Sequence, residues 1–233
     1  MNESSLDLLW ESIPSALKLL RLMPADCWEW IQAKSIAPMR KHMVLHFTRS
    51  LTITDFDRVL VHSQRVRVIG GSGHFYTAFM PTESIQFKHK ANYLSPIIST
   101  LALFPQLRTL TLITHDDAPH TLYFAMMVPS LQKINWTIVL DNWPSTVELL
   151  FTQFAKNCTA QLASLDLKHE SATVVDVCTY AKIEHFMYPF LPTFASLKDL
   201  RITYTAANLQ LLLETLSHLH QIEVLEASKT VGM

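Results

Sequence analysis

Residues 104–114, FPQLRTLTLIT, decide the fold, because they join a turn to a short apolar strand whose pattern can be searched for elsewhere. Leu107, Leu110 and Leu112 give the order apolar, two variable residues, apolar, one variable residue, apolar. The alternation between Leu110 and Leu112 is typical of a strand that buries one face. This is either one strand of an ordinary core or one unit of a repeat.

The same pattern recurs along the chain, in copies that start at positions 66, 107, 131, 162, 197 and 222. The first copy is degenerate and the last is a weaker match. The copies span Val66–Gly71, Leu107–Leu112, Leu131–Trp136, Leu162–Leu167, Leu197–Ile202 and Ile222–Ala227. A series of such units, 24 to 41 residues apart, indicates an irregular repeat.

Between the copies, the apolar period changes to that of a helix. Ser145–Asn157 has a capping serine followed by an apolar stripe, and Thr205–His220 places leucines on one broad face. Pro189 and Pro192 predict that the helix before them ends near Phe186–Tyr188. Less regular helices are expected at Asp55–Val61, with Thr54 as the cap, and at Asn92–Phe104.

Strands that alternate with helices run parallel and have right-handed connections. The sequence therefore predicts an α/β fold: a leucine-rich-repeat-like right-handed solenoid of five or six irregular repeats. Its parallel strands form the concave face and its helices the convex face. We expect this solenoid over residues 51–233, and over residues 1–50 an N-terminal helical region that contains Trp28 and Trp30 and caps the first repeat. The alternative is a doubly wound α/β domain, which favours a glycine-rich turn; the chain has only 4 glycines.

Several segments together resemble a known family. LDLLWESIPSALKLLRLMPAD (6–26), LHFTRSLTITDFDRVLVHSQRVRVIGG (45–71), FPQLRTLTL (104–112) and FASLKDLRITYTAANLQLLLETLSHLHQIEVLEA (194–227) occur in a characteristic order. Their order resembles the part after the F-box in the basidiomycete (fungal) F-box family, whose C-terminal region is leucine-rich-repeat-like. The resemblance covers nearly the whole chain.

That resemblance implies a substrate-recognition region without catalytic residues. In the family, an N-terminal F-box docks on the Skp-type adaptor of a cullin–RING ubiquitin ligase, and the repeats hold an unidentified protein target. Here Leu9 and Trp10 leave no room for an F-box, so adaptor binding is expected only if an F-box lies upstream of Met1. The C-terminal repeats are also expected to be cut short. Three alternatives stay open: a stand-alone repeat scaffold unrelated to ubiquitin, an incomplete or diverged fragment, and, least favoured, a small α/β enzyme.

Composition argues against several classes of protein. The net charge is -1 and the densest basic cluster, Arg40–Met43, is short, so nucleic-acid binding is not expected. Three cysteines lie far apart without a CxxC pair, which predicts buried thiols rather than a zinc site or disulfides. Neither a signal peptide nor a membrane span is recognisable, so we expect no membrane partner and a cytoplasmic or nuclear location.

Two short motifs contain residue types that occur in phosphate-binding and metal-binding sites. Gly70–His74, GGSGH, fits neither GxGxxG nor GxxxxGK and is interpreted as a connector after the first copy. His115–His120, HDDAPH, lacks the i, i+4 spacing of a zinc helix and suits a polar loop. No serine stands in GxSxG. We therefore expect no catalytic, cofactor-binding or metal-binding residue, and no enzyme.

A binding surface is expected where strand residues point away from the core. The positions beside the buried ones give a polar column of mixed sign, which suits a protein target. Its members are Thr109, Thr111, Lys133, Asn135, Ser164, Asp166, Asp199, Arg201, Val224 and Glu226. A plain solvated sheet face is the alternative. Leu8, Leu9 and Trp10 form a second expected exposed surface.

Overall fold

The computed structural model describes residues 8–33, 42–70, 83–87, 103–114, 125–139, 145–170 and 177–229 of the 233. The chain forms two compact units. The first consists of Met1–Thr111 and Ala118–Val128, and the second of Leu112–Asp117 and Pro129–Met233. The boundary expected at residue 50 lies inside the first unit.

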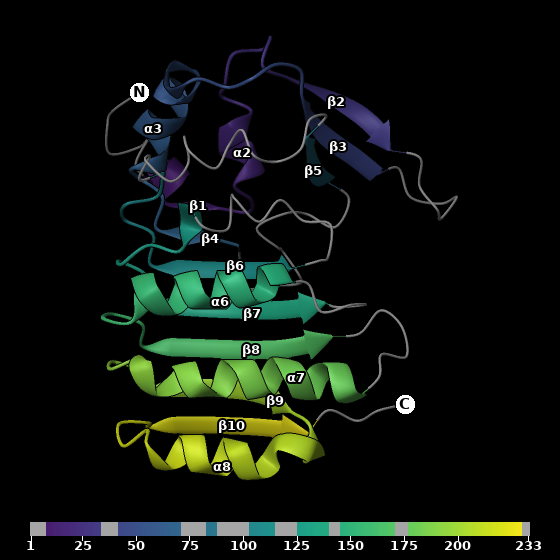
Figure 1. The fold of residues 1–233 in the computed structure, drawn as a ribbon. Coiled ribbons are helices and arrows are strands. Elements are labelled where there is room, and N and C mark those ends of the chain that lie inside the picture. Colours follow the sequence, from purple (N-terminus) through teal and green to yellow (C-terminus); the bar gives the residue numbers. More distant parts are fainter. Residues whose placement is uncertain are drawn as a thin grey trace. The chain divides into compact units, whose positions relative to one another are not determined.

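The first unit contains short parallel strands beside small helices (Figure 1). Strand β4 (Val68–Ile69) pairs with β1 (Ser12–Ile13) on one side and with the start of β6 (Thr109–Thr114) on the other. The degenerate first copy of the repeat pattern therefore does form a strand. The helices of the first unit include α2 (Leu17–Leu20), the 3₁₀ helix η1 (Ile53–Phe56) and α3 (Asp57–Ser63).

A second, three-stranded sheet in this unit corrects the prediction of a helical region over residues 1–50. Strands β2 (Trp28–Ala33) and β3 (His42–Phe47) are antiparallel, and β3 pairs in parallel with β5 (Glu83–Phe87). The two tryptophans of β2 alternate with polar residues, which is a strand period, and their rings contact at 6.4 Å. Helix in this region is confined to residues 8–11 and α2 among the described residues.

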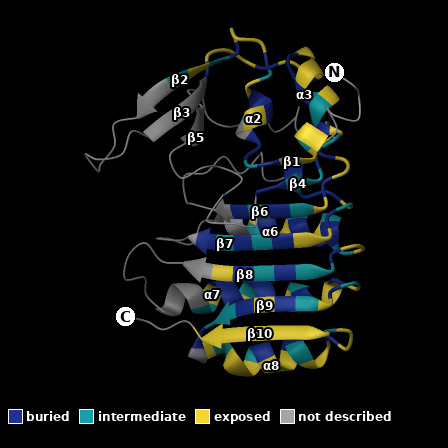
Figure 2. Ribbon diagram, turned by 180° about the vertical axis from the view of Figure 1, so that it is seen from behind, coloured by how far each residue is buried: buried dark blue, intermediate teal, exposed yellow. Residues whose placement is uncertain are grey.

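The second unit alternates parallel strands with helices. Strands β7 to β10 lie side by side in chain order, and the pictures from both sides place the helices over one face of them (Figures 1 and 2). The elements are β7 (Lys133–Val139), α6 (Ser145–Cys158), β8 (Ser164–Glu170), α7 (Val177–Met187), η3 (Tyr188–Thr193), β9 (Asp199–Tyr204), η4 (Ala206–Asn208), α8 (Leu209–Ser217) and β10 (Val224–Lys229). The predicted α/β class with mostly parallel strands is thus confirmed.

The helix predictions that fall on described residues are confirmed in outline and corrected in detail. Helix α7 ends at Met187, directly before the proline-containing segment, and the chain continues as a 3₁₀ helix. The cap predicted at Thr54 is wrong: Thr52 precedes η1, and the Asp55 carboxylate accepts from its backbone N–H (2.7 Å) and hydroxyl (2.9 Å). The predicted helix at Asn92–Phe104 lies mostly outside the described residues. Residues 71–74 of the GGSGH motif and the whole HDDAPH motif (115–120) also lie outside the described residues. Gly70, with φ 84°, takes the left-handed conformation that glycine favours.

The core is built from the apolar positions that define the repeat pattern. Its strand side chains are at most 2% exposed: Leu110, Leu112, Ile134, Trp136, Leu165, Leu167, Leu200 and Ile202. In the second unit, Trp136 stacks on Phe151 of α6 at 4.5 Å, and Phe154 contacts Phe194 at 4.9 Å. These contacts hold a helix against the strands through large apolar surfaces.

The last strand departs from this pattern. Every residue of β10 is exposed (yellow in Figure 2), so the prediction that Leu225 and Ala227 point into a core is wrong. The reason is position: among the described strands, β10 stands last in the sheet order. A residue at an apolar position of the repeat pattern is therefore buried only where neighbouring elements cover its side chain.

Candidate functional site

Seven polar side chains and Val224 form two aligned rows across the strands of the second unit. The parallel pairing sets Lys133, Ser164, Asp199 and Val224 in one row, and Asn135, Asp166, Arg201 and Glu226 in the next. Neighbouring strands are about 4.8 Å apart, so the members of each row are close neighbours. We call these eight residues the polar strand face.

The polar strand face is open because the helices lie on the other side. Side chains alternate along a strand, so residues between the buried leucines point away from the helical layer. Each of the eight is half-buried or exposed. The structure thus brings eight of the ten predicted residues together; Thr109 and Thr111 are half-buried on β6, with the first unit.

Ion pairs link the charges on this face. Arg201 contacts the carboxylates of Asp199 (3.3 Å) and Glu226 (3.4 Å), and these contacts hold the pKa of Arg201 above its ordinary value, the hydrogen bond to Asp199 most of all. The hydroxyl of Ser164 donates to Asp199 at 3.1 Å. Exposed pairs of this kind add little stability, so their effect is to order the side chains.

A shallow hollow of about 410 Å³ opens on the same face, over β8, β9 and β10. Residues 166–168, 201–203 and 225–228 line it. One of them, Lys168, pairs with Asp166 at 3.0 Å and was missed by the sequence analysis. The alternation along the strand could have identified Lys168, which lies two residues after Asp166 and so points to the same side. The six-residue repeat pattern ends at Leu167, and Lys168 therefore fell outside it.

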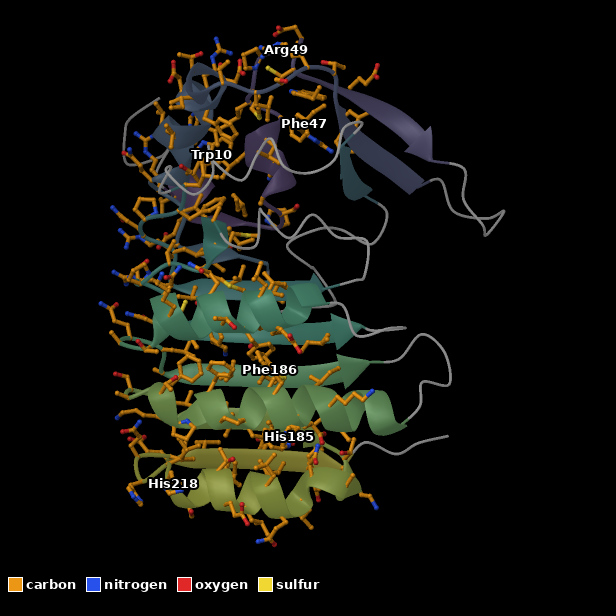
Figure 3. The ribbon with its side chains drawn as sticks, in the orientation of Figure 1. Trp10, Phe47, Arg49, His185, Phe186 and His218 are labelled. Carbon is orange, nitrogen blue, oxygen red and sulfur yellow. The ribbon has the colours of Figure 1, made fainter. Side chains whose placement is uncertain are left out.

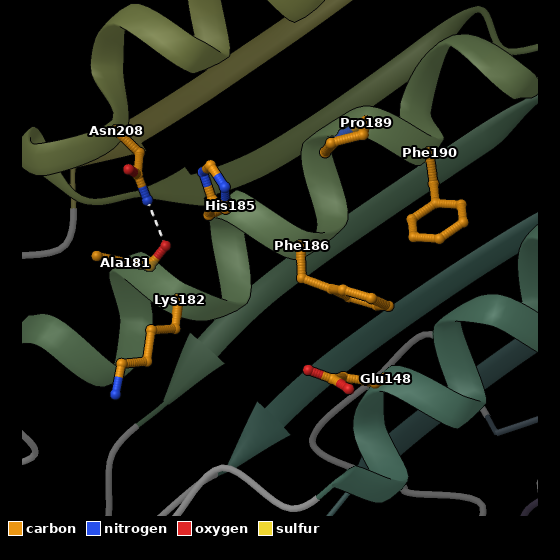
Figure 4. Close-up of a pocket in the computed structure, with 8 residues that line it drawn as sticks. All are labelled: Glu148, Ala181, Lys182, His185, Phe186, Pro189, Phe190 and Asn208. Carbon is orange, nitrogen blue, oxygen red and sulfur yellow. Dashed lines mark hydrogen bonds between the residues drawn. The ribbon is translucent and has the colours of Figure 1, made fainter.

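A second hollow, of about 590 Å³, lies on the helical side of the same unit (Figure 4). Phe186 of α7 and Phe190 of η3 supply its apolar part, with ring centroids 5.2 Å apart. Lys182 and His185 are exposed beside it, and Figure 3 also shows His185 and Phe186 on this helix. The sequence gives no sign of this hollow, because a helical stripe predicts which face is buried but not which gaps remain between helices.

A buried carboxylate joins two helices next to this hollow. Glu184 of α7 is fully buried and accepts hydrogen bonds from the backbone N–H and hydroxyl of Thr205 and from the side-chain amide of Asn208 (3.0 Å). Burial raises the pKa of Glu184. The amide of Asn208 also donates to the carbonyl of Ala181, as the dashed line in Figure 4 shows. These bonds fix the start of α8 on α7, which is a structural role.

In the first unit, Arg49, which is labelled in Figure 3, organises a compact charged cluster. The guanidinium of Arg49 contacts Asp55 through two nitrogens (2.8 and 2.9 Å), Asp26 at 2.8 Å and the sulfur of Cys27 at 2.9 Å. Burial raises the pKa of the Cys27 thiol to about 11, and burial raises that of Cys158 to about 12. Both cysteines are buried thiols outside any disulfide and have raised pKa values, so neither is an activated nucleophile.

The second expected exposed surface is present only in part. Leu8 and Leu9 are exposed, whereas Trp10 is half-buried and its ring lies 4.5 Å from that of His62. Within the described ranges, no group of three or more histidines, cysteines and acids could hold a metal ion. The helices described in the structure include none that is long and apolar enough to span a membrane.

No protein-family model, curated protein or solved structure matches the chain. The resemblance to the F-box family therefore stays a prediction that rests on the quoted segments.

Proposed function

We propose that the chain is a protein-binding module, built as an irregular leucine-rich-repeat-like solenoid, whose polar strand face holds a protein target. The observation that carries this proposal is the parallel register, which aligns seven outward polar residues and Val224 on four consecutive strands while helices occupy the other face. Such a surface offers rigidly spaced contacts to an extended segment of a partner.

The charges of the face suggest the chemistry of that target. The cations Lys133 and Arg201 lie among the anions Asp166, Asp199 and Glu226, and Lys168 adds a third cation beside the face. A uniformly charged ligand would meet repulsion somewhere on this surface, so the best complement is a polypeptide segment of mixed charge. Arginine is enriched among interface residues of high energetic weight, which makes Arg201 the favoured anchor.

The wider context of the proposal comes from the sequence resemblance. Under it, the target is a substrate of a cullin–RING ubiquitin ligase in the cytoplasm or nucleus, and the Skp-type adaptor is a partner only if an F-box lies upstream of Met1. The contribution of this chain is positioning, not catalysis. The competing function is a repeat scaffold with no link to ubiquitin, which would bind its target through the same face.

Affinity purification from the source cells, with matched variants, tests the binding role. The test variant is Arg201→Ala/Glu226→Ala, which removes an exposed ion pair from the polar strand face. The control is Lys198→Ala/Glu223→Ala, which removes an exposed ion pair (2.7 Å) just before the same two strands. We expect a set of proteins that the wild type and the control retain and the test variant loses.

Equal recovery with both variants would contradict binding by this face. Recovery of an Skp-type adaptor with the endogenous protein would support the ligase context. Its absence, with the target still bound, would favour the scaffold.

A further inference from the structure

The start of α8 is held on α7 by one buried carboxylate. Glu184 is 0% exposed, and its carboxylate accepts hydrogen bonds from the backbone N–H and the hydroxyl of Thr205. The side-chain amide of Asn208 donates to the same carboxylate at 3.0 Å and also donates to the carbonyl of Ala181 (Figure 4). We call Ala181, Glu184, Thr205 and Asn208 the α7–α8 joint.

The α7–α8 joint lies where the pairing of the sheet changes. Among the described pairs, β9 pairs with β8 only from Asp199 to Ile202, although β8 continues to Glu170. Thr205 directly follows the end of β9, and the 3₁₀ helix η4 then leads into α8. The hydrogen bonds to Glu184 therefore fix a stretch of chain that β8 does not hold.

The described hydrogen-bond partners of the Glu184 carboxylate are neutral. Thr205 and Asn208 supply donors but no positive charge, and Lys182 and His185 of the same helix are exposed. A carboxylate that is buried without a cation loses its hydration, which disfavours the charged form. Burial accordingly raises the pKa of Glu184, and the hydrogen bonds, which favour the charged form, offset only part of this effect.

The joint offers hydrogen-bond partners to both protonation states of Glu184. The charged carboxylate accepts from Thr205 and Asn208, whereas the neutral acid has a proton to donate, which the hydroxyl oxygens of Thr205 and Tyr188 can accept. The buried hydroxyl of Tyr188 makes no well-formed hydrogen bond among the described contacts, and burial together with the nearby Glu184 raises the pKa of Tyr188. Tyr204, at the end of β9, also acts on Tyr188. Tyrosine side chains ordinarily ionise near pH 10, so Glu184 is the group of this cluster that titrates below about pH 8.

We propose that the α7–α8 joint is a pH-sensitive switch. With a proton on Glu184 the joint stays closed. Once the proton is lost, a local opening that returns the carboxylate to water becomes more favourable. This opening releases the end of β9 and the start of α8 from α7, while the pairing of β8 with β9 up to Ile202 remains.

The switch also acts on the polar strand face. Thr203 lies on β9 two residues before Thr205, and it lines the hollow of about 410 Å³ on that face together with Arg201. Opening of the joint therefore changes the shape of this hollow, so that the target binds more weakly as the pH rises. This last step rests on the proposed function, whereas the opening itself does not.

The direction of the effect follows from the pKa of Glu184 in the two states. In the open joint the carboxyl has its ordinary pKa of 4.5, and in the closed joint the pKa is higher. The stabilisation of the closed joint is therefore complete below pH 4.5 and is lost as the pH rises through the pKa of the closed joint. Over this interval the equilibrium constant for opening rises up to about tenfold for each pH unit, and above it the constant no longer changes.

Amide hydrogen exchange of the purified full chain between about pH 4 and 8, corrected for the intrinsic exchange rate, tests the switch. The backbone N–H of Thr205 reports the opening, because it donates to Glu184 itself. We expect its protection to fall with rising pH in the wild type and to be independent of pH in Glu184→Gln. The control, Glu214→Gln, removes an exposed carboxyl of α8 and should keep the pH dependence.

Two results would overturn the proposal, and neither depends on whether a target binds the polar strand face. An equal pH dependence in the wild type and in Glu184→Gln would assign the effect to another group. Protection of the Thr205 N–H equal to that of the amides of β7 would mean that the joint opens only when the whole chain unfolds.

A measurement on the wild type alone covers the case in which Glu184→Gln does not fold. In carbon-13 spectra of the glutamate carboxyl groups, one glutamate should titrate above pH 4.5, and the chemical shift of the Thr205 N–H should follow the same midpoint. A Thr205 N–H that follows no such midpoint would overturn the switch.

Discussion

Replacement of Trp136 tests which face of the strands packs into the core. Trp136 is 1% exposed, stacks on Phe151 at 4.5 Å and meets Phe154 edge-on at 5.9 Å. A buried tryptophan removes roughly 200 Å² of apolar surface from water, which at about 25 cal/mol per Å² gives an upper figure of about 5 kcal/mol. Residual burial in the unfolded chain reduces this by roughly 10–40%.

We therefore expect Trp136→Ala to lower the free energy of unfolding by about 3–5 kcal/mol, which is the range for such truncations. Trp136→Phe keeps a ring for Phe151 and should cost less than half as much. The control is Lys133→Ala, three residues earlier on the same strand with its side chain exposed, which should change stability by less than about 0.5 kcal/mol.

Urea unfolding followed by far-UV circular dichroism measures all three variants at constant pH. The m-value should stay constant if the unfolded states are alike. A loss below about 1 kcal/mol for Trp136→Ala, or an equal loss for Lys133→Ala, would refute the assignment of the buried face. A strand shifted by one residue would give a small loss for Trp136→Ala and a larger loss for Lys133→Ala, since every side chain would change face.

Three further predictions concern ionisable groups. Burial raises the pKa of Glu184 above 4.5, so its contribution to stability is complete below pH 4.5 and is lost as the pH rises through the folded value. The stability of the wild type minus that of Glu184→Gln should thus fall as the pH rises from 4 to 8; a rise would contradict the pKa shift. The Arg49 guanidinium lowers the pKa of Asp55 below 3.8, so Asp55→Asn should cost about 1–3 kcal/mol at pH 7 and less as the pH falls below 3.8; a cost independent of pH would count against this ion pair. Cys27 and Cys158 are buried with raised pKa values, so a thiol reagent at pH 8 should label them only after unfolding, as peptide mapping would show. Rapid labelling of either cysteine in the folded protein would contradict this prediction.

The strands of the second unit could be predicted from the sequence because their signal is local. Each buried strand there has an apolar residue at alternate positions, and one helix-covered face imposes that period. The end of α7 was predictable for a similar reason, since Pro189 restricts the residue before it. Both signals depend on neighbours in the chain rather than on distant contacts.

The first unit was less predictable because its strands do not follow the leucine pattern. Trp28 and Trp30 alternate as strand residues do, but amphipathic aromatic residues occur in both helices and strands. The two-residue strands β1 and β4 are too short for any period, and their pairing is a long-range contact. The exposure of Leu225 likewise depends on what covers β10, which its own sequence does not encode.

The polar strand face could be predicted residue by residue but not as an arrangement. Alternation shows that Asp166 and Arg201 point outward, whereas their adjacency depends on the register between β8 and β9. The ion pair between Arg201 and Glu226 depends on the next register. The hollow beside Phe186 depends on helix packing and had no sequence signal.

The aligned polar strand face depends most directly on the register between β8 and β9, and paired cysteines measure this register. Asp166 and Arg201 are opposed on adjacent parallel strands, so their Cα atoms lie about 5 Å apart, within disulfide range. Asp166→Cys/Arg201→Cys should therefore oxidise readily to an internal disulfide that peptide mapping detects. Asp166→Cys/Thr203→Cys, two residues out of register at about 8 Å, should not. A disulfide in the second variant and none in the first would contradict the aligned polar strand face and, with it, the proposed binding surface.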